Sequence, residues 1–231
     1  MRAHKDRIRD LAEGLWTVER SHGFLGVDVG GRMNVIRLLS GGLFLHSPVP
    51  FSGELGEWLA GLGEVKYVVA PNRFHHIHVG DYMHAYPGAL FLAAPGLPEK
   101  RRDVTFTGLL GGNAPSDWDG EVEHFVFGGM PLLNEAVFLH KPSRTLILTD
   151  LLFNFSEDLT MGQKVFALLD GVRGRPSVSM LMRRFLIKDK AAVRESADRV
   201  LEWDFDRILL SHKDIVERGG REAFRLAYED F

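Results

Sequence analysis

Cysteine is absent from the 231-residue chain, which excludes disulfide bonds and thiolate metal ligands. Long hydrophobic runs are also absent, because no stretch of about 18 apolar residues could cross a membrane. The first ten residues, MRAHKDRIRD, are charged and lack the apolar core of a signal peptide. The sequence therefore predicts a cytoplasmic protein with no membrane partner.

A large net charge is lacking too, since 28 basic and 31 acidic residues give a formal charge of −3. This balance provides no general attraction to nucleic acid, so no nucleic-acid partner is expected. One local cluster of arginines occurs in the stretch VRGRPSVSMLMRRF, residues 172–185. We interpret this cluster as a solvated basic face rather than as a phosphate-binding patch.

No linker rich in proline and serine divides the sequence, so residues 1–231 are expected to form a single domain. The hydrophobic content of 45% and the charged content of 26% are ordinary for a globular protein. The chain is long enough to bury a substantial core.

The first 46 residues alternate apolar runs with glycine turns, a pattern that predicts a β-meander. The expected strands are LWTVE (15–19), FLGVDV (24–29), RMNVIRLL (32–39) and GLFLH (42–46). A helix should follow Ser52, because Leu55, Trp58, Leu59 and Leu62 have helical spacing. The nearly continuous apolar run VKYVVA (65–70) then predicts a strand that is buried on both faces.

The rest of the chain mixes strands and helices. Strands are expected at 89–94, 121–127, 134–140, 144–150 and 207–211, and helices at 157–169, at 191–203 and from Gly219 onward. Early hairpins followed by mixed strands and helices predict two β-layers covered by helices.

A histidine-rich stretch, PNRFHHIHVGDYMH (71–84), directly follows the buried strand and holds four of the ten histidines. His76 lies just beyond that strand, Asp150 ends a later strand, and His212 ends the last one. Loops at strand ends can bring side chains together from distant parts of a chain. Two imidazoles and a carboxylate form a three-ligand set for zinc or iron and leave a position open for water or substrate.

The order of these segments resembles that of the metallo-β-lactamase superfamily. That family shows T-H-x-H-x-D-H after a buried strand, then G-H-T-P-G, a strand ending in G-D-L-L-F and a late strand ending in histidine. The corresponding stretches here are APNRFHHI, GGMP, ILTDLLF and ILLSH. The resemblance covers most of the chain and identifies it as a member of a divergent branch of this superfamily. It implies an α+β fold, a four-layer αββα sandwich of two mixed β-sheets flanked by helices.

Carried over residue by residue, the resemblance implies that His76, Asp150 and His212 take the places of the family's second metal site. His75 replaces the aspartate of the first motif and is a further candidate ligand. The histidines of the first metal site fall instead on Pro71, Arg73 and Gly129, which lack imidazoles. We therefore expect at most one tightly bound ion in each chain.

Two further residues are candidates for catalysis. Glu135 follows the GGMP turn, and we leave open whether it is a surface residue at the start of a strand, an extra ligand or a general base. If Arg73 points inward, its guanidinium would repel a second cation and offer a planar fork to an anionic substrate group. His78, Asp81 and His84 are interpreted as a solvated or locally hydrogen-bonded face.

The sequence therefore predicts a mononuclear metal-dependent hydrolase that acts on a small-molecule substrate, which the arginine suggests is anionic. The cofactor expected is one divalent ion, zinc in the first place and iron as the alternative. A second hypothesis is a non-catalytic binding protein that keeps the fold without hydrolytic activity. The identity of the substrate and the oligomeric state are unknown from the sequence.

Overall fold

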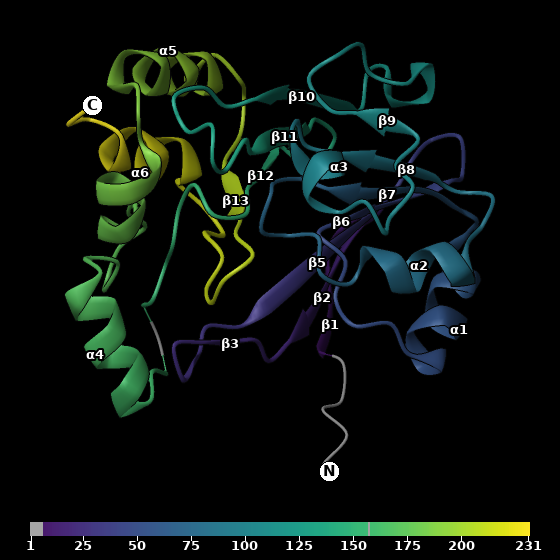
Figure 1. Cartoon of the computed structure of the whole chain (residues 1–231), viewed down its shortest axis with the longest axis horizontal. Coiled ribbons are helices and arrows are strands. Elements are labelled where there is room, and N and C mark those ends of the chain that lie inside the picture. The colour runs from purple at the N-terminus through teal and green to yellow at the C-terminus, as the bar shows by residue number, and fades with distance from the viewer. Residues whose placement is uncertain (1–6, 157) are drawn as a thin grey trace.

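Two mixed β-sheets lie face to face in the computed structural model, which describes residues 7–156 and 158–231 (Figure 1). The strands of the first sheet are antiparallel from β1 to β6 and parallel from β6 to β9. In spatial order they are β1 (Arg7–Ala12), β2 (Leu15–Arg20), β5 (Gly31–Arg37), β6 (Leu43–His46), β7 (Val65–Ala70), β8 (Leu90–Ala93) and β9 (Gly108–Leu109).

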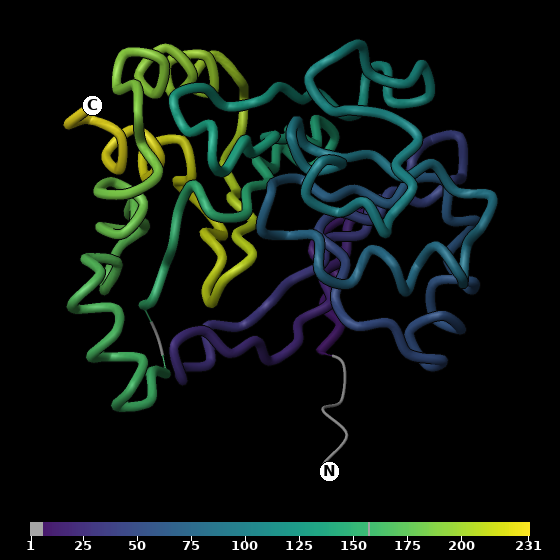
Figure 2. Tube along the Cα trace, viewed as in Figure 1, coloured from purple at the N-terminus to yellow at the C-terminus, as the bar shows by residue number. Residues whose placement is uncertain are grey.

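The second sheet consists of β10 (Val122–Val126), β11 (Ala136–His140), β12 (Thr145–Ile147) and β13 (Arg207–Leu209), in that spatial order. Its first three strands are antiparallel, whereas β12 and β13 are parallel. The tube in Figure 2 shows that the first sheet comes from the first half of the chain and that the second sheet ends with the late strand β13.

Helices cover the outer faces of both sheets. The first sheet carries α1 (Gly53–Leu62) and α2 (Val79–Ala85), and the second carries α5 (Lys190–Leu201) and α6 (Gly220–Ala227). The αββα sandwich expected from the sequence is therefore confirmed. The remaining elements are the hairpin β3 (Gly23–Phe24) and β4 (Val27–Asp28), α3 (Leu97–Lys100), a 3₁₀ turn (Ser116–Trp118), α4 (Met161–Leu169) and a short π-helix (Met182–Leu186).

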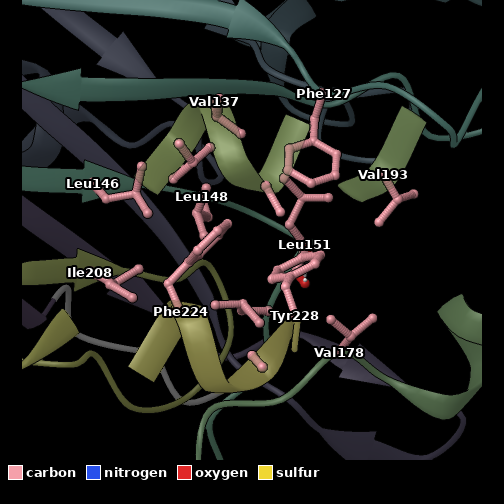
Figure 3. Packing of buried hydrophobic residues seen from close by; sticks show 14 of the residues in the cluster. Phe127, Val137, Leu146, Leu148, Leu151, Val178, Val193, Ile208, Phe224 and Tyr228 are labelled. Atoms are coloured by element: carbon pink, nitrogen blue, oxygen red, sulfur yellow. Dashed lines mark hydrogen bonds between the residues drawn. The ribbon is translucent and has the colours of Figure 1, made fainter. Parts of the chain in front are cut away.

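Three apolar layers hold the sandwich together. Between the sheets, Phe44 packs against Trp118 with 4.9 Å between ring centroids and against Phe138 with 5.6 Å. Outside the first sheet, Leu55 and Leu59 of α1 are fully buried, as their helical spacing predicts. Outside the second sheet, α5 and α6 bury another cluster, part of which is shown in Figure 3. Burial of this apolar surface is the main favourable term in folding.

The structure differs from the sequence-based prediction in the β-meander and at the start of one helix. Residues 24–29 form two short strands of a separate hairpin, because Leu25 (φ 48°) and Gly26 (φ 78°) turn the chain back. The helix expected at 157–169 begins at Met161, where Thr160 and Gln163 cap each other reciprocally. Residue 157 lies outside the described residues. The edge strand β1 was not predicted, because its residues are largely exposed and charged.

The ends of four strands meet at one edge of the sandwich. β6 and β7 are parallel and lead to Ser47 and Pro71, and β12 and β13 are parallel and lead to Asp150 and His212. The backbone N–H of Ala136 donates to the carbonyl of Pro71 over 2.8 Å, which joins the two sheets at this edge. The loops that carry the candidate ligands are thereby brought together.

Candidate metal centre

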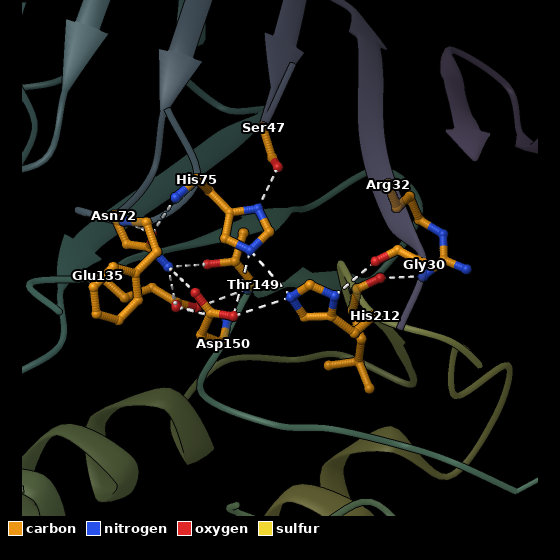
Figure 4. Close-up of polar contacts among 11 residues, drawn as sticks. Gly30, Arg32, Ser47, Asn72, His75, Glu135, Thr149, Asp150 and His212 are labelled. Atoms are coloured by element: carbon orange, nitrogen blue, oxygen red, sulfur yellow. Dashed lines mark hydrogen bonds and ion pairs between the residues drawn. The ribbon is translucent and has the colours of Figure 1, made fainter. Parts of the chain in front are cut away.

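Three potential metal ligands converge at this edge, and they are His75, Asp150 and His212 (Figure 4). Nε2 of His75 lies 3.2 Å from Nε2 of His212 and 3.3 Å from Oδ1 of Asp150. Nε2 of His212 lies 3.2 Å from the same carboxylate oxygen. Among the described residues, this is the group of histidine and acidic side chains whose ligand atoms are close enough to share one ion.

The triangle formed by these three atoms fits a small divalent ion. In a tetrahedral zinc site, bonds of about 2.0 Å place neighbouring ligand atoms about 3.3 Å apart. The three edges measured here are 3.2, 3.2 and 3.3 Å. Two imidazole nitrogens and one carboxylate oxygen are also a donor set that zinc and non-haem iron accept. The residues present therefore fit a single ion with three protein ligands.

His212 is oriented by contacts on the side away from the triangle. Its Nδ1 lies 2.8 Å from the carbonyl oxygen of Gly30. Because that oxygen can only accept, Nδ1 carries the hydrogen and Nε2 keeps its lone pair when the ring is neutral. The ring stacks on Phe153 with 5.3 Å between centroids and 6° between planes. This tautomer and orientation are those required of a metal ligand.

A buried guanidinium supports the loop around His212. Arg32 lies on β5 and donates to the carbonyls of Leu210 and Lys213, the latter over 2.7 Å, and to Oε1 of Glu19 over 2.9 Å. Only 4% of Arg32 is exposed, and the carboxylate of Glu19 offsets part of the cost of burying the charge. Arg32 therefore holds both sides of the His212 turn in place.

Asn72 connects the loop after β7 with the loop after β12. Its Nδ2 lies within 2.7–3.0 Å of three acceptors, Oδ2 of Asp150, Oγ1 of Thr149 and Oε2 of Glu135. Its Oδ1 accepts from the backbone N–H groups of Phe74 and His75, at 2.8 and 2.7 Å. The side chain of Asn72 therefore shapes the turn that carries His75. It also orients Asp150, whose other oxygen, Oδ1, is left facing the two histidines.

Glu135 is buried and serves as an acceptor for backbone groups. Its Oε1 accepts from the N–H of Thr149 over 2.7 Å, and its Oε2 accepts from the N–H of Asp150 over 2.8 Å. Burial and the negative charge of Asp150 raise the pKa of Glu135, although these hydrogen bonds act in the opposite direction. The interpretation of Glu135 as a surface residue is therefore wrong, because only 1% of it is exposed. The contacts assign it a positioning role.

The electrostatics of the centre favour an ionised carboxylate. Burial opposes ionisation of Asp150, but the adjacent imidazoles of His75 and His212 outweigh it and hold the pKa of Asp150 well below its usual range. For His75 burial lowers the pKa, but the neighbouring Asp150 dominates and raises it. Ser47, in the left-handed region at φ 57°, places its Oγ 2.8 Å from Nδ1 of His75.

A pocket of about 720 Å³ opens above the centre. His75, Asp150 and His212 form part of its wall, together with Lys100 and His22. Much of the remaining wall is apolar and comes from the β3–β4 hairpin, the loop after β7, the segment after β12, α4 and the segment around the π-helix. These apolar residues include Phe24, Phe74, Ile77, Phe153, Phe166, Leu181, Met182, Phe185 and Leu186.

The structure does not bring His76 into the triangle. Residues 71–78 form turns, and α2 begins only at Val79, so neighbouring side chains in this segment point in different directions. Nδ1 of His76 accepts from Nη1 of Arg101 over 2.9 Å. Burial and the charges of Lys100 and Arg101 lower the pKa of His76 to about 4. His75 occupies the place that the sequence analysis gave to His76.

Arg73 also lies apart from the centre, because its side chain does not line the pocket. Its Nη1 donates to the carbonyl of Pro131 over 3.2 Å, and its guanidinium packs beside Gly96. The inward-facing arrangement considered for Arg73 is therefore not the one observed. Lys100, which donates to the carbonyl of Arg73 over 2.7 Å, lines the pocket, as do Arg20 and Arg32.

Packing explains two of the three positions that lack first-site histidines. Pro71 is buried and its carbonyl joins the two sheets. Gly129 has φ 82°, and a Cβ added there would lie 2.3 Å from the carbonyl oxygen of Asp189 and 2.6 Å from Val193. The N-terminal turn of α5 therefore fills the space that a side chain at position 129 would need.

Sequence reasoning missed several residues that shape the centre. Ser47, Asn72, Arg32 and Lys100 were not selected, since each belongs to a residue type that is common at surfaces and turns. For Asn72 a signal was present, because a polar side chain directly after a buried strand often forms a turn with the backbone two or three residues on. Selecting it would have indicated which of the two adjacent histidines joins Asp150 and His212.

Comparisons with known proteins agree with this architecture. A solved metallo-β-lactamase from Pontibacter korlensis has a TM-score of 0.69 and 11% identity, covering 98% of this chain and 100% of that one. A metallo-β-lactamase from Erythrobacter litoralis has a TM-score of 0.69 and 13% identity, and the match covers 100% of this chain and 99% of that one. The metallo-β-lactamase FIM-1 from Pseudomonas aeruginosa, in its mono-zinc form, has a TM-score of 0.67 and 11% identity. This match covers 97% of this chain and 95% of that one.

At such low identity these structures establish the fold alone. No curated protein sequence matches the chain. Residues 12–161 match the model of a family described as "Domain of unknown function (DUF4336)". The chain therefore belongs to this DUF4336 family and has the metallo-β-lactamase fold.

Proposed function

We propose that the protein is a mononuclear metal-dependent hydrolase of a small molecule that has a bulky apolar part. The observation that carries the proposal is the triangle of ligand atoms from His75, Asp150 and His212, whose edges match those of a zinc site. This triangle lies in the wall of the large pocket rather than in a closed core. An open pocket beside a three-ligand centre is the arrangement of a catalytic site rather than of a structural one.

Zinc is the ion we propose, and His75, Asp150 and His212 would hold it. When bound, such an ion supplies positive charge that polarises a carbonyl or phosphoryl oxygen and lowers the pKa of water. The chain supplies orientation. The Gly30 carbonyl fixes the tautomer of His212, and Asn72 holds one oxygen of Asp150.

Lys100 is proposed to bind an anionic group of the substrate, the part that the sequence analysis gave to Arg73. Its ammonium group lies 5.4 Å from the ring centroid of Phe74, and both residues line the pocket. The aromatic and aliphatic walls would bury the rest of the substrate and exclude water from the reacting bond. A substrate with an apolar body and one polar or anionic end fits this distribution.

The test is a screen of zinc-loaded protein against esters, thioesters, lactones, amides and phosphoesters with apolar substituents. We expect turnover that is lost on chelation, restored by zinc and absent in Asp150→Ala. The matched control is Asp81→Ala, because Asp81 is an exposed carboxylate on α2 that does not line the pocket. Background rates for every class with one zinc ion bound would contradict the hydrolase proposal.

A non-catalytic binding protein is the second candidate, and one observation favours it. Both oxygens of Glu135 accept backbone hydrogen bonds, so this carboxylate is not available as a general base. The binding protein would retain an apolar ligand without converting it. Calorimetry that shows ligand binding to zinc-loaded protein, with unchanged ligand recovered afterwards, would select this candidate.

A further inference from the structure

Charge is distributed unevenly along the chain. Residues 159–188, which we call the basic apolar lobe, contain α4, the π-helix and the loop between them. The lobe has one acidic residue, Asp170, which is buried. Its six basic residues are Lys164, Arg173, Arg175, Arg183, Arg184 and Lys188. Six basic residues and one acidic residue give the lobe a formal net charge of +5. Because the whole chain has a formal charge of −3, the rest of the chain has −8.

The same lobe exposes an unusual number of large apolar side chains. Helices on a protein surface normally present polar residues to water, but α4 presents Met161, Val165, Leu168 and Leu169. Met180, Leu181 and Phe185 are exposed nearby in sequence, and all seven are between 41% and 75% exposed. Large apolar side chains exposed in this number on one segment mark a candidate interaction site.

The outer face of α4 is not left over from an incomplete core. Its inner face is already packed, since Ala167 is buried and Nε2 of Gln163 donates to the carbonyl of Asp28 over 2.6 Å. Phe166 meets Phe24 of the β3–β4 hairpin edge to face, with 6.2 Å between centroids. Figure 1 shows this hairpin reaching toward α4. Leu25, at the tip of the hairpin, is 76% exposed and adds to the apolar surface.

We propose that the basic apolar lobe docks on the surface of an anionic phospholipid membrane. Exposed leucine, methionine and phenylalanine side chains enter the boundary between headgroups and acyl chains, and arginine and lysine side chains bind the phosphates. No helix in the described part of the chain is long and apolar enough for a membrane span. The expectation of no membrane partner rested on the lack of such a run, whereas the lobe belongs to folded elements that lie flat on a surface.

Charge complementarity favours a membrane over a second copy of the chain. A symmetric dimer through this surface would bring one basic lobe against the other, and like charges would repel. A nucleic acid would satisfy the arginines but would leave the leucines of α4 in water. An anionic bilayer complements both kinds of side chain.

Docking through the lobe would also place the pocket beside the lipid. Phe166, Leu181 and Phe185 belong to the lobe and line the pocket. A substrate with an acyl chain or another apolar body could then pass from the bilayer into the pocket. This link to catalysis rests on the proposed function, whereas docking itself does not.

The experiment is flotation of the full chain with vesicles of phosphatidylcholine alone and of phosphatidylcholine with about 30% phosphatidylglycerol. We expect binding to the anionic vesicles that 0.5 M NaCl weakens, since salt screens charge. The double changes Leu168→Ser/Leu169→Ser and Arg173→Glu/Arg175→Glu should each lower the partition coefficient about tenfold or more. Leu39→Ser and Arg102→Glu are matched controls, because both residues are exposed and outside the lobe.

Equal loss of binding in the controls, or no binding of the unchanged protein to anionic vesicles, would overturn the proposal. So would sedimentation that shows a dimer disrupted by the leucine changes without any vesicle binding, because the surface would then be a self-interface. Metal-free protein and Asp150→Ala should still float with the vesicles. A failure of the hydrolase proposal is therefore distinguishable from a failure of this one.

Discussion

At the scale of single residues, the centre depends on side chains that fix other side chains. The clearest case is Asn72, whose buried Nδ2 lies within hydrogen-bond distance of three polar oxygens and whose Oδ1 accepts from two backbone N–H groups. Removing a partner from a buried polar network costs the desolvation of every group left unpaired. Asn72 therefore matters for both the stability of the fold and the orientation of the ligands.

Asn72→Ala should lower the free energy of unfolding by about 3 kcal/mol, because it leaves two carboxylates and two N–H groups short of partners. It should also weaken zinc binding at least about tenfold, because Asp150 loses one of its orienting contacts. Urea denaturation and zinc titration measure the two effects. Asn113→Ala, at an exposed position, is the control and should change neither by much. An Asn72→Ala protein with unchanged stability would refute this account of the loop.

His46 gives a second prediction at this scale. It is fully buried, and burial together with the nearby His75 lowers its pKa to about 3. The ordinary histidine pKa in an unfolded chain is about 6.5. Above pH 6.5 both states are neutral, so His46 adds no pH dependence there. Below pH 6.5 the unfolded chain binds a proton that the folded state rejects, and stability falls as the pH drops toward 3.

We expect His46→Gln to remove up to about 1.4 kcal/mol of this loss for each pH unit below 6.5. Urea denaturation of both proteins from pH 8.5 to pH 4.5 measures the difference. The two stability curves should be parallel above pH 7 and should converge or cross below pH 6. Parallel curves over the whole range would show that His46 takes up a proton in the folded protein.

At the scale of elements, regular periodicity made the strands and covering helices predictable. The helix after Ser52 and the strand at 65–70 were both predicted from the spacing of apolar residues, and both are present. The β3–β4 hairpin was predicted as one strand, because nothing in the apolar pattern reveals the positive φ of Leu25 and Gly26. Turns have no such periodicity, and for the same reason sequence reasoning gave His76 the first place among the ligands and kept His75 only as a further candidate.

The packing of α5 against the loop before β11 yields a prediction for Gly129. Gly129→Ala should destabilise the protein by about 3 kcal/mol or more, because the added Cβ meets Asp189 and Val193 and the residue has a positive φ. Gly174→Ala is the matched control, since Gly174 has φ 83° with open space around its Cβ position. The control isolates the backbone cost of about 1 kcal/mol. Equal thermal stability of the two variants would show that α5 readily moves aside.

At the scale of the whole molecule, one edge of the sandwich carries the candidate chemistry and the basic apolar lobe lies beside it. The sequence resemblance predicted the fold and predicted that loops far apart in the chain would meet. It did not predict the pocket walls, because these come from segments that differ from the family's motifs. The charge difference between the lobe and the rest of the chain was readable from the sequence, but the exposure of α4 required the structure.

The central claim is that one ion is held by His75, Asp150 and His212, and metal analysis of protein purified without added metal or chelator tests it most directly. Elemental analysis should give about one zinc per chain for the unchanged protein. It should give almost none for His75→Ala and about one for His76→Ala, the matched neighbour, whose imidazole accepts from Arg101 instead. Anomalous scattering should place that ion between the three ligands. Two ions per chain, or loss of zinc in His76→Ala with retention in His75→Ala, would contradict the account.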